Sequence, residues 1–253
     1  MVRRAPLAAF FALTFAITWG VGLLAAVAPP GIVGQLAFYV AVYGPTLSAL
    51  LLTGLLGGGG GLKKLLGGAV RWRVGARWYL VVLVGLPLSW VVASLLGAAF
   101  GEGTTGFASM EDLLLLPVLL FTDPGPIGEE IGWRGFALPG LLERAGALTA
   151  SVALGVVWAV WHLPAFVLPG FPQSDGPFLL FTAALVAQSV LMTWIYRGTG
   201  GSVLLAGILF HLAVNATISL EVGAYPIWVA LLSAAAVAVV AATGPKRLGR
   251  QTA

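Results

Sequence analysis

Long apolar segments recur along the whole chain, and they constrain its fold more than any other feature. A helix that crosses a bilayer needs about 20 consecutive apolar residues, because only a closed hydrogen-bonded structure satisfies the backbone inside hydrocarbon. Of the 253 residues 59% are hydrophobic and 9% are charged, whereas about 25% are charged in soluble domains. No polar block is long enough to fold separately. The sequence therefore predicts an all-α, polytopic membrane protein with a single transmembrane domain over residues 1–253.

The apolar runs predict about eight transmembrane helices. They fall near residues 7–28, 32–56, 78–100, 113–141, 147–168, 177–196, 202–220 and 225–243. An alternative with six spans merges the weaker segments and is disfavoured, because it would place basic clusters on both sides of the membrane. The first run is longer than the apolar region of about 7–15 residues in a signal peptide, so we expect an uncleaved helix.

Positive charge marks one side of this predicted bundle. Twelve of the thirteen Lys and Arg residues precede the first span or follow an even-numbered one, and they are Arg3, Arg4, Lys63, Lys64, Arg71, Arg73, Arg77, Arg144, Arg197, Lys246, Arg247 and Arg250. The opposite side carries acidic residues, which are Glu102, Glu111, Asp112, Asp175 and Glu221. Because Lys and Arg are enriched in cytoplasmic loops, both termini are predicted to be cytoplasmic. Topology thus explains the net charge of +4 better than a nucleic-acid partner does.

A run of glycines at residues 57–61 opens the longest basic connection. Such a low-complexity segment predicts a flexible start to the loop. The basic stretch after it contains Trp72 and Trp78, aromatic residues that are typical of headgroup depth, so we expect it to bind anionic lipid.

The fourth span contains the sequence TDPGP, followed by the adjacent carboxylates Glu129 and Glu130. Two prolines cannot continue a regular helix, so we expect a break and a restart with Thr122 or Asp123 as the N-cap. Broken helices at membrane depth occur where the backbone lines a buried or wet cavity. Arg134 lies four residues after Glu130 and is expected to pair with it along one helix face, while Glu129 points about 100° away.

Both histidines of the chain, His162 and His211, lie inside apolar spans. His162 follows Trp158, and Asn215 follows His211, at a spacing of four residues that shares one helix face. At a rise of about 1.5 Å per residue, the depth is about 20 Å for Glu129, about 22 Å for His162 and about 14 Å for His211. Ionisable groups in hydrocarbon are costly unless they are paired or face a polar cavity. Each of these polar residues alone could serve only as a hydrogen-bonded link between helices. Together they predict an active site at mid-membrane depth. Trp158 is expected to pack against this site.

The polar residues form three ordered motifs, EEIGWRGF at 129–136, WAVWH at 158–162 and HLAVN at 211–215, within a core of residues 113–220. They resemble the motifs EExxxR, FxxxH and HxxxN of the CAAX protease and bacteriocin-processing family of intramembrane proteases, which includes the type II CAAX prenyl endopeptidases. The earlier segments YGPTLSALLL and RWRVGARWYL also resemble this family. Two positions depart from its pattern: Trp158 replaces the usual Phe, and Gly140 stands where a basic residue is frequent.

The resemblance implies hydrolysis of peptide bonds within the membrane, in a peptide or lipidated-peptide substrate. Glu129 would act as the general base that activates water, and His162 would help to hold this water. His211 and Asn215 would stabilise the oxyanion. Positioned donors of this kind stabilise the negative charge that develops in the transition state.

The resemblance also implies that Glu130 and Arg134 support the site electrostatically. No cofactor is favoured, but zinc is compatible with the sequence: Glu129, His162 and His211 would be its three protein ligands, with water in the fourth position. The absence of Cys excludes thiolate nucleophiles and Cys-ligated metals. An HExxH pair, which would preassemble two ligands on one helix, is absent from the sequence.

Two other classes of function remain open at the level of the sequence. A broken helix at membrane depth is also typical of proton-coupled or cation-coupled transporters, although no inverted repeat is recognisable in this chain. A non-catalytic membrane scaffold or immunity protein could keep the motifs for packing alone. The substrate and the oligomeric state are not encoded in any motif of this sequence.

Overall fold

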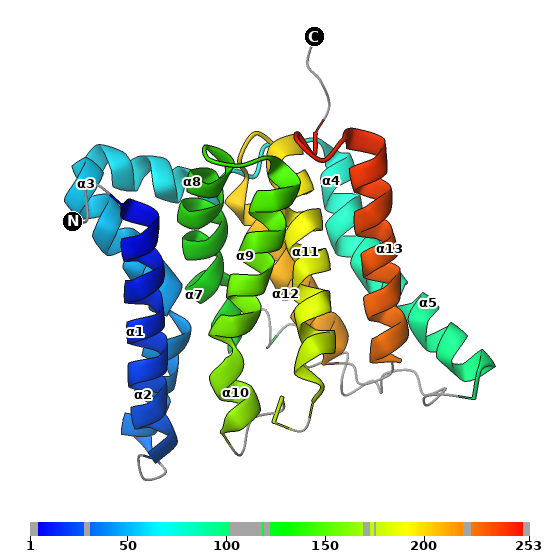
Figure 1. Ribbon diagram of the computed structural model, residues 1–253, viewed down its shortest axis with the longest axis horizontal. Coiled ribbons are helices and arrows are strands. Elements are labelled where there is room, and N and C mark those ends of the chain that lie inside the picture. Colours follow the sequence, from blue (N-terminus) through cyan, green and yellow to red (C-terminus); the bar gives the residue numbers. More distant parts are fainter. Residues whose placement is uncertain are drawn as a thin grey trace.

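The computed structural model describes residues 5–27, 31–101, 118, 122–168, 173–174, 176–219 and 224–249. Within these ranges all regular structure is helical (Figure 1). The elements are α1 (Pro6–Val27), α2 (Ile32–Val42), α3 (Gly44–Ala69), α4 (Ala76–Leu80), η1 (Val81–Gly85), α5 (Leu86–Ala99), α7 (Gly125–Gly132), η2 (Trp133–Ala137), α8 (Leu138–Leu142), α9 (Ala147–Trp161), α10 (Leu163–Val167), α11 (Phe178–Gly198), η3 (Leu204–Leu209), α12 (Phe210–Ile218) and α13 (Tyr225–Thr243).

Five of the described helices are long and apolar enough to cross a membrane: Pro6–Leu24, Gly44–Ala69, Ala76–Ala99, Phe178–Gly198 and Tyr225–Thr243. Shorter apolar helices accompany them. The prediction of an all-α, multi-pass membrane protein is therefore confirmed, while the count of eight spans stays a prediction. Most of the first half of the predicted fourth span lies outside the described residues.

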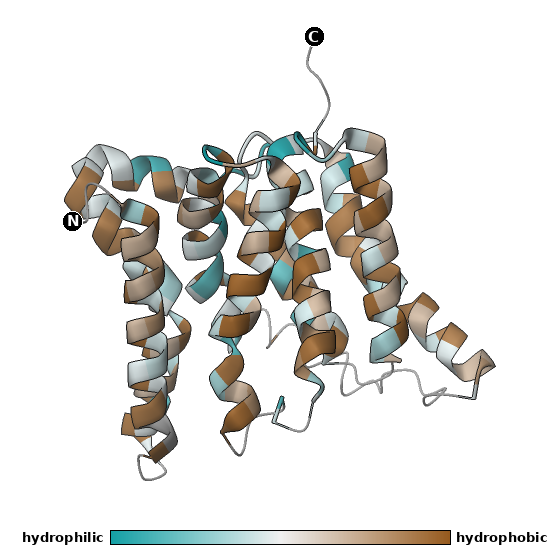
Figure 2. Cartoon of the chain, viewed as in Figure 1, coloured by the Kyte–Doolittle hydropathy of each residue, from teal (hydrophilic) through white to brown (hydrophobic). Residues whose placement is uncertain are grey.

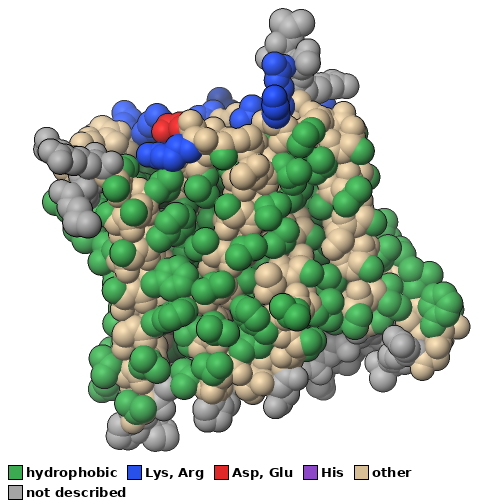
Figure 3. Space-filling model, in the orientation of Figure 1, with side chains coloured by type: hydrophobic (Ala, Val, Ile, Leu, Met, Phe, Trp, Pro, Cys, Tyr) green, Lys and Arg blue, Asp and Glu red, His purple; other side chains and the backbone are tan. Residues whose placement is uncertain are grey.

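The outer surface of the bundle is apolar, as expected for helices in contact with lipid. Large hydrophobic side chains such as Leu179 and Val237 are exposed on it, and Figures 2 and 3 show hydrophobic residues over most of the visible face. A soluble monomer rarely exposes such a continuous apolar surface. Hydrophilic residues lie at one end of the bundle and again on α7 in its interior (Figure 2).

The glycine run at residues 57–61 differs from its prediction as a flexible loop. These residues belong to α3, and the helix is interrupted at Gly58, which has φ 55° and ψ −153°. A positive φ costs glycine little, because it has no Cβ. Beyond this break α3 runs across one end of the bundle (Figure 1). The basic residues Lys63 and Lys64 lie there, and both are exposed.

Lys and Arg side chains gather at this same end of the molecule, from which the described chain also leaves α13 (Figures 1 and 3). None of the described cations of the predicted cytoplasmic side is buried. Arg134 is the described exception and is completely buried. Arg3, Arg4, Arg250 and the acidic residues expected on the opposite side lie outside the described residues.

The lack of cysteine in the chain makes its orientation directly measurable. We expect a membrane-impermeant maleimide, added to intact cells, to label Gln173→Cys and not Lys64→Cys. Lys64 lies at the basic end, whereas Gln173 lies between α10 and α11 at the opposite end. Permeabilised cells should label both variants, and the parent protein provides the background. Labelling of Lys64→Cys alone in intact cells would show the reverse orientation.

Close approach of helix backbones positions the elements that carry the polar residues. A Cβ on Gly132 of α7 would lie 2.5 Å from the backbone carbonyl of Pro45 in α3. A Cβ on Gly155 of α9 would lie 2.7 Å from the Cα of Val186 in α11. Small residues at such contacts are typical of packed membrane helices. These contacts fix α7 and α9 against their neighbours.

Candidate active site

The six site residues predicted from the sequence come together in the interior of the bundle. Four of them line a cavity of about 700 Å³, and they are Glu129, His162, His211 and Asn215. Glu130 and Arg134 lie behind this wall and are completely buried. The other lining residues come from the second half of α1, the end of α2, the segment that leads into α7, the end of α9, α10, the first half of α11, α12 with the residue after it, and the beginning of α13. The cavity therefore lies in the half of the bundle that is distant from the basic end (Figure 1).

The helix restarts at Gly125 after the break that the sequence predicts, but its N-cap is Pro124 and not the expected Thr122 or Asp123. Asp123 accepts a hydrogen bond from the backbone N–H of Gly125 through Oδ1, at 2.9 Å. The Asp123 carboxylate lies one residue before the N-cap and accepts from an amide of the first turn that has no partner within the helix. Thr122 instead donates to the carbonyl oxygen of Val118. The π-helix η2 follows α7 directly and carries Arg134.

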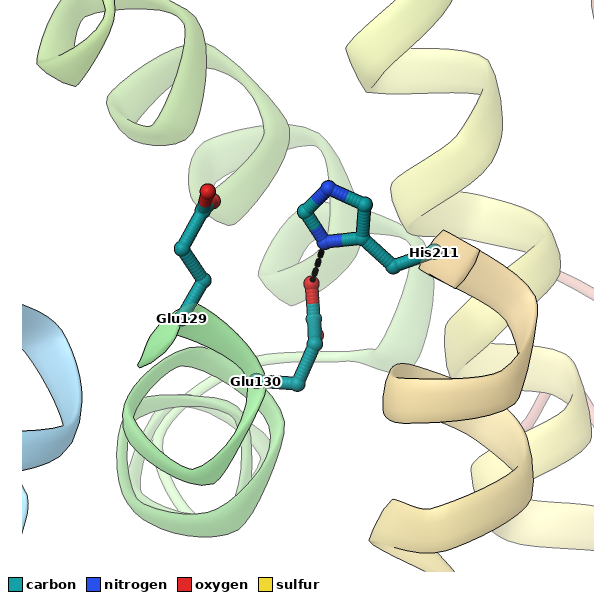
Figure 4. Close-up of side chains that lie close together, drawn as sticks. All are labelled: Glu129, Glu130 and His211. Carbon is teal, nitrogen blue, oxygen red and sulfur yellow. Dashed lines mark hydrogen bonds and ion pairs between the residues drawn. The ribbon is translucent and has the colours of Figure 1, made fainter. Parts of the chain in front are cut away.

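Glu130 is the centre of a buried ionic network. Arg134 donates from Nη1 to Oε1 at 3.0 Å and lies 3.0 Å from Oε2, so the predicted pair is confirmed. Nδ1 of His211 lies 2.9 Å from Oε1 of Glu130 (Figure 4). The guanidinium carbon of Arg134 is 4.1 Å from the centre of the Trp158 ring. Removing one partner of such a buried pair costs about 3–5 kcal/mol, because the other charge is left uncompensated.

Glu129 leaves α7 on a different side from Glu130 (Figure 4). The indole N–H of Trp158 donates to Oε2 of Glu129 at 2.6 Å. Trp158 is thus more than the packing wall expected from the sequence, because it fixes one carboxylate oxygen. A Cβ on Gly125 would lie 3.4 Å from both Oε1 of Glu129 and Nε2 of His211. These two atoms therefore face the same small space beside the backbone of Gly125.

His162 lies just beyond the end of α9 and is held by that helix. Its Nδ1 is 2.9 Å from the carbonyl oxygen of Trp158. Since a carbonyl oxygen only accepts, Nδ1 carries the proton, and Nε2 is the acceptor in the neutral ring. Trp161 and Phe181 make edge-to-face contacts with the imidazole. Their ring centres lie 4.6 and 5.2 Å from the centre of the His162 ring. His162 therefore has a fixed ring whose bond to Trp158 leaves Nε2 open.

Asn215 is oriented by a residue that the sequence indicated only as a helix cap. Nδ2 of Asn215 donates to Oδ2 of Asp123 at 2.8 Å. The carboxylate of Asp123 thus holds both the start of α7 and the amide of Asn215. One N–H of that amide is used, and the second has no partner in the described part of the chain, so it can donate to a ligand. The position of Asp123 at the break was the available signal, but its partner on α12 required the tertiary fold.

The donor atoms match a hydrogen-bonded network better than the zinc site considered from the sequence. Among the described residues, the acidic and imidazole groups that approach within 4.8 Å of one another are Glu129, Glu130 and His211. His162 is not part of this cluster. Zinc requires its ligand atoms at about 2.0–2.2 Å from one point. Because His162 lies outside this cluster, the expected set of Glu129, His162 and His211 is not assembled, and Glu130 is already paired with Arg134 and Nδ1 of His211.

Gly207 of η3 is required by the close approach of Glu130. A Cβ at this position would lie 2.9 Å from Cβ and 3.0 Å from Oε2 of Glu130. We expect Gly207→Ala to lower the free energy of unfolding by about 1–3 kcal/mol, because the buried carboxylate has no room to move. Thermal unfolding in detergent measures this loss. Gly67→Ala is the matched control, since no atom lies within 4 Å of a Cβ there, and equal stability of the two variants would contradict the prediction.

Comparisons with known proteins agree with this geometry. The family model "Type II CAAX prenyl endopeptidase Rce1-like" matches residues 111–217, a range that contains all six predicted site residues. The chain is 29% identical over 147 residues to the CAAX prenyl protease 2 of Methanococcus maripaludis, and the match covers 53% of each protein. The chain thus spans about half the length of this curated relative. The matched region, which contains the buried Glu-Glu-His cluster, is thus similar to the Rce1-like type II CAAX prenyl endopeptidases.

Proposed function

We propose that this protein is an intramembrane endopeptidase that hydrolyses peptide bonds of membrane-associated substrates with water activated by Glu129. One observation carries the proposal: Oε1 of Glu129 and Nε2 of His211 face the same space at the wall of a cavity of about 700 Å³. Attack by water on a peptide bond requires a base and a second polar group that face one common position.

In the proposed reaction, Oε1 of Glu129 accepts a proton from water while the resulting hydroxide attacks the scissile carbonyl. Trp158 holds the other carboxylate oxygen, so the base keeps its direction. His162, which lines the same cavity, accepts the second hydrogen of the water at Nε2. Glu129 then returns its proton to the leaving amine, which restores the carboxylate.

The tetrahedral intermediate carries a negative oxygen that needs donors. We assign this task to the free N–H of Asn215 and to Nε2 of His211 when that atom carries a proton. Glu130 accepts from Nδ1 of His211 and balances its positive charge. Asp123 and Glu130 thus orient the two donors before the substrate binds, which is the condition for effective electrostatic stabilisation.

The cavity wall suits an apolar substrate segment. It contains Phe38, Val42, Leu168, Phe181 and Leu185 beside the polar groups. The relative from Methanococcus maripaludis is named a CAAX prenyl protease. We therefore propose that the substrate is a membrane-bound peptide, and that a prenylated peptide is one member of this class.

The direct test is cleavage by the purified protein in liposomes. The probes are a farnesylated peptide ending in Cys-Ala-Ala-X, the same peptide without the lipid, and a single-span apolar peptide, with products identified by mass spectrometry. We expect cleavage of at least one membrane-bound peptide, and unchanged activity after exhaustive chelation. Intact peptides in every arm would contradict the proposal, and activity that chelation abolishes would contradict its metal-free form.

A further inference from the structure

One polar side chain of the cavity wall belongs to none of the sequence motifs. Phe181, Leu185 and Gln188 of α11 all line the cavity. Their spacing of four and three residues places them on one face of the helix. Gln188 is 3% exposed, and its Oε1 is buried without a hydrogen-bond partner among the described residues.

Several other polar groups of the wall are already engaged, although the buried indole N–H of Trp161 also lacks a partner among the described residues. The hydroxyl groups of Thr18, Thr122 and Ser219 donate to backbone carbonyl oxygens. The acid, imidazole and amide groups of the proposed active site each have a protein partner. Buried polar groups are nearly always hydrogen-bonded, so an unpaired carboxamide oxygen at a cavity indicates a partner that arrives with a ligand.

We infer that Gln188 binds a main-chain amide group of the substrate beside the scissile bond. This inference rests on the proposed peptidase function. A carboxamide offers an acceptor and a donor in one plane, which is the complement of the N–H and C=O of a peptide unit. A peptide that enters this apolar wall loses the water on its backbone, and each unpaired backbone group then weakens binding. Gln188 supplies the replacement bonds.

The consequence concerns specificity. A side chain that hydrogen-bonds to main-chain groups of the substrate is compatible with many substrate sequences. Phe181 and Leu185 on the same face contact apolar side chains or a lipid chain of the substrate. The substrate backbone must lie along α11 next to His162, whose ring packs against Phe181. Gln188 is therefore a substrate-binding residue rather than a participant in proton transfer.

The test combines variants of Gln188 with esters in the substrate. Gln188→Leu and Gln188→Met keep a similar volume and remove the hydrogen bonds. A cleaved peptide from the liposome assay is remade with single ester bonds, each of which replaces one backbone N–H by oxygen near the scissile bond. Ser189→Ala is the matched control, because Ser189 is also buried with an unpartnered hydroxyl but does not line the cavity.

We expect both Gln188 variants to lose about tenfold in kcat/KM on the all-amide peptide, mainly through KM, as the loss of one hydrogen bond predicts. At one ester position, kcat/KM of the wild type should also fall about tenfold. At the same position, kcat/KM of the Gln188 variants should fall less than about twofold, because their hydrogen bond to the substrate N–H is already missing. In Ser189→Ala, the ester should lower kcat/KM by the same factor as in the wild type. Mass spectrometry shows whether the cleaved bond stays the same.

The outcomes separate the two proposals. If the wild type cleaves the peptide and every ester costs the Gln188 variants as much as it costs the wild type, Gln188 does not bind the substrate backbone, while the peptidase function stands. If the wild type cleaves none of the probes, the peptidase function is wrong and this inference is wrong with it.

Discussion

Glu129→Gln is expected to lower kcat for peptide cleavage by about a hundredfold to ten-thousandfold, the range that a general base contributes. The amide keeps the shape of the carboxylate and still offers an oxygen to the indole N–H of Trp158, but it cannot take a proton from water. The variant should therefore fold and bind substrate normally. Single-turnover cleavage of the liposome-bound peptide measures the chemical step.

Glu143→Gln is the matched control for this experiment, because Glu143 is exposed near the end of α8. It should keep full activity. A Glu129→Gln variant that is as active as the wild type would exclude Glu129 as the base. An unchanged cellular phenotype would instead favour the scaffold interpretation, and proton flux that depends on Glu129 in liposomes would favour transport.

Arg134→Met is expected to lower the free energy of unfolding by about 3–5 kcal/mol. Arg134 is completely buried between the Glu130 carboxylate and the Trp158 ring. Its removal leaves the charge of Glu130 in an apolar interior without its cation. Equilibrium unfolding in detergent measures the loss. The exposed Arg144, which donates to the carbonyl of Gly140, gives the control variant Arg144→Met with little expected change.

A double-mutant cycle identifies the cause of this loss. Glu130→Gln combined with Arg134→Met removes both charges, so the double variant should be less destabilised than the sum of the two single variants. Additive losses would show that Arg134 acts through packing on Trp158 and not through its charge. A stable Arg134→Met protein would contradict the role of the ion pair altogether.

The fold was largely predictable because hydrocarbon imposes a simple rule on the sequence. A segment such as α11 must be apolar and helical over about 20 residues to cross a bilayer, and both properties are visible in the chain. The break before α7 was predictable from two prolines. The inclusion of residues 57–61 in α3 was not predictable, because glycine has little local preference for a helix.

Within the site, the sequence by itself determined the contacts that depend on spacing along one helix. Glu130 and Arg134 are four residues apart and therefore pair, and Asn215 follows His211 on the same face. The sequence also identified the polar groups that hydrocarbon makes costly.

The tertiary structure decided the contacts between helices. They join Trp158 to Glu129, His211 to Glu130 and Asp123 to Asn215, and they place Gln188 at the cavity. These pairs depend on how the helices rotate and cross. That arrangement is set by close contacts such as the one between Gly132 and Pro45, and it is not encoded in any one segment.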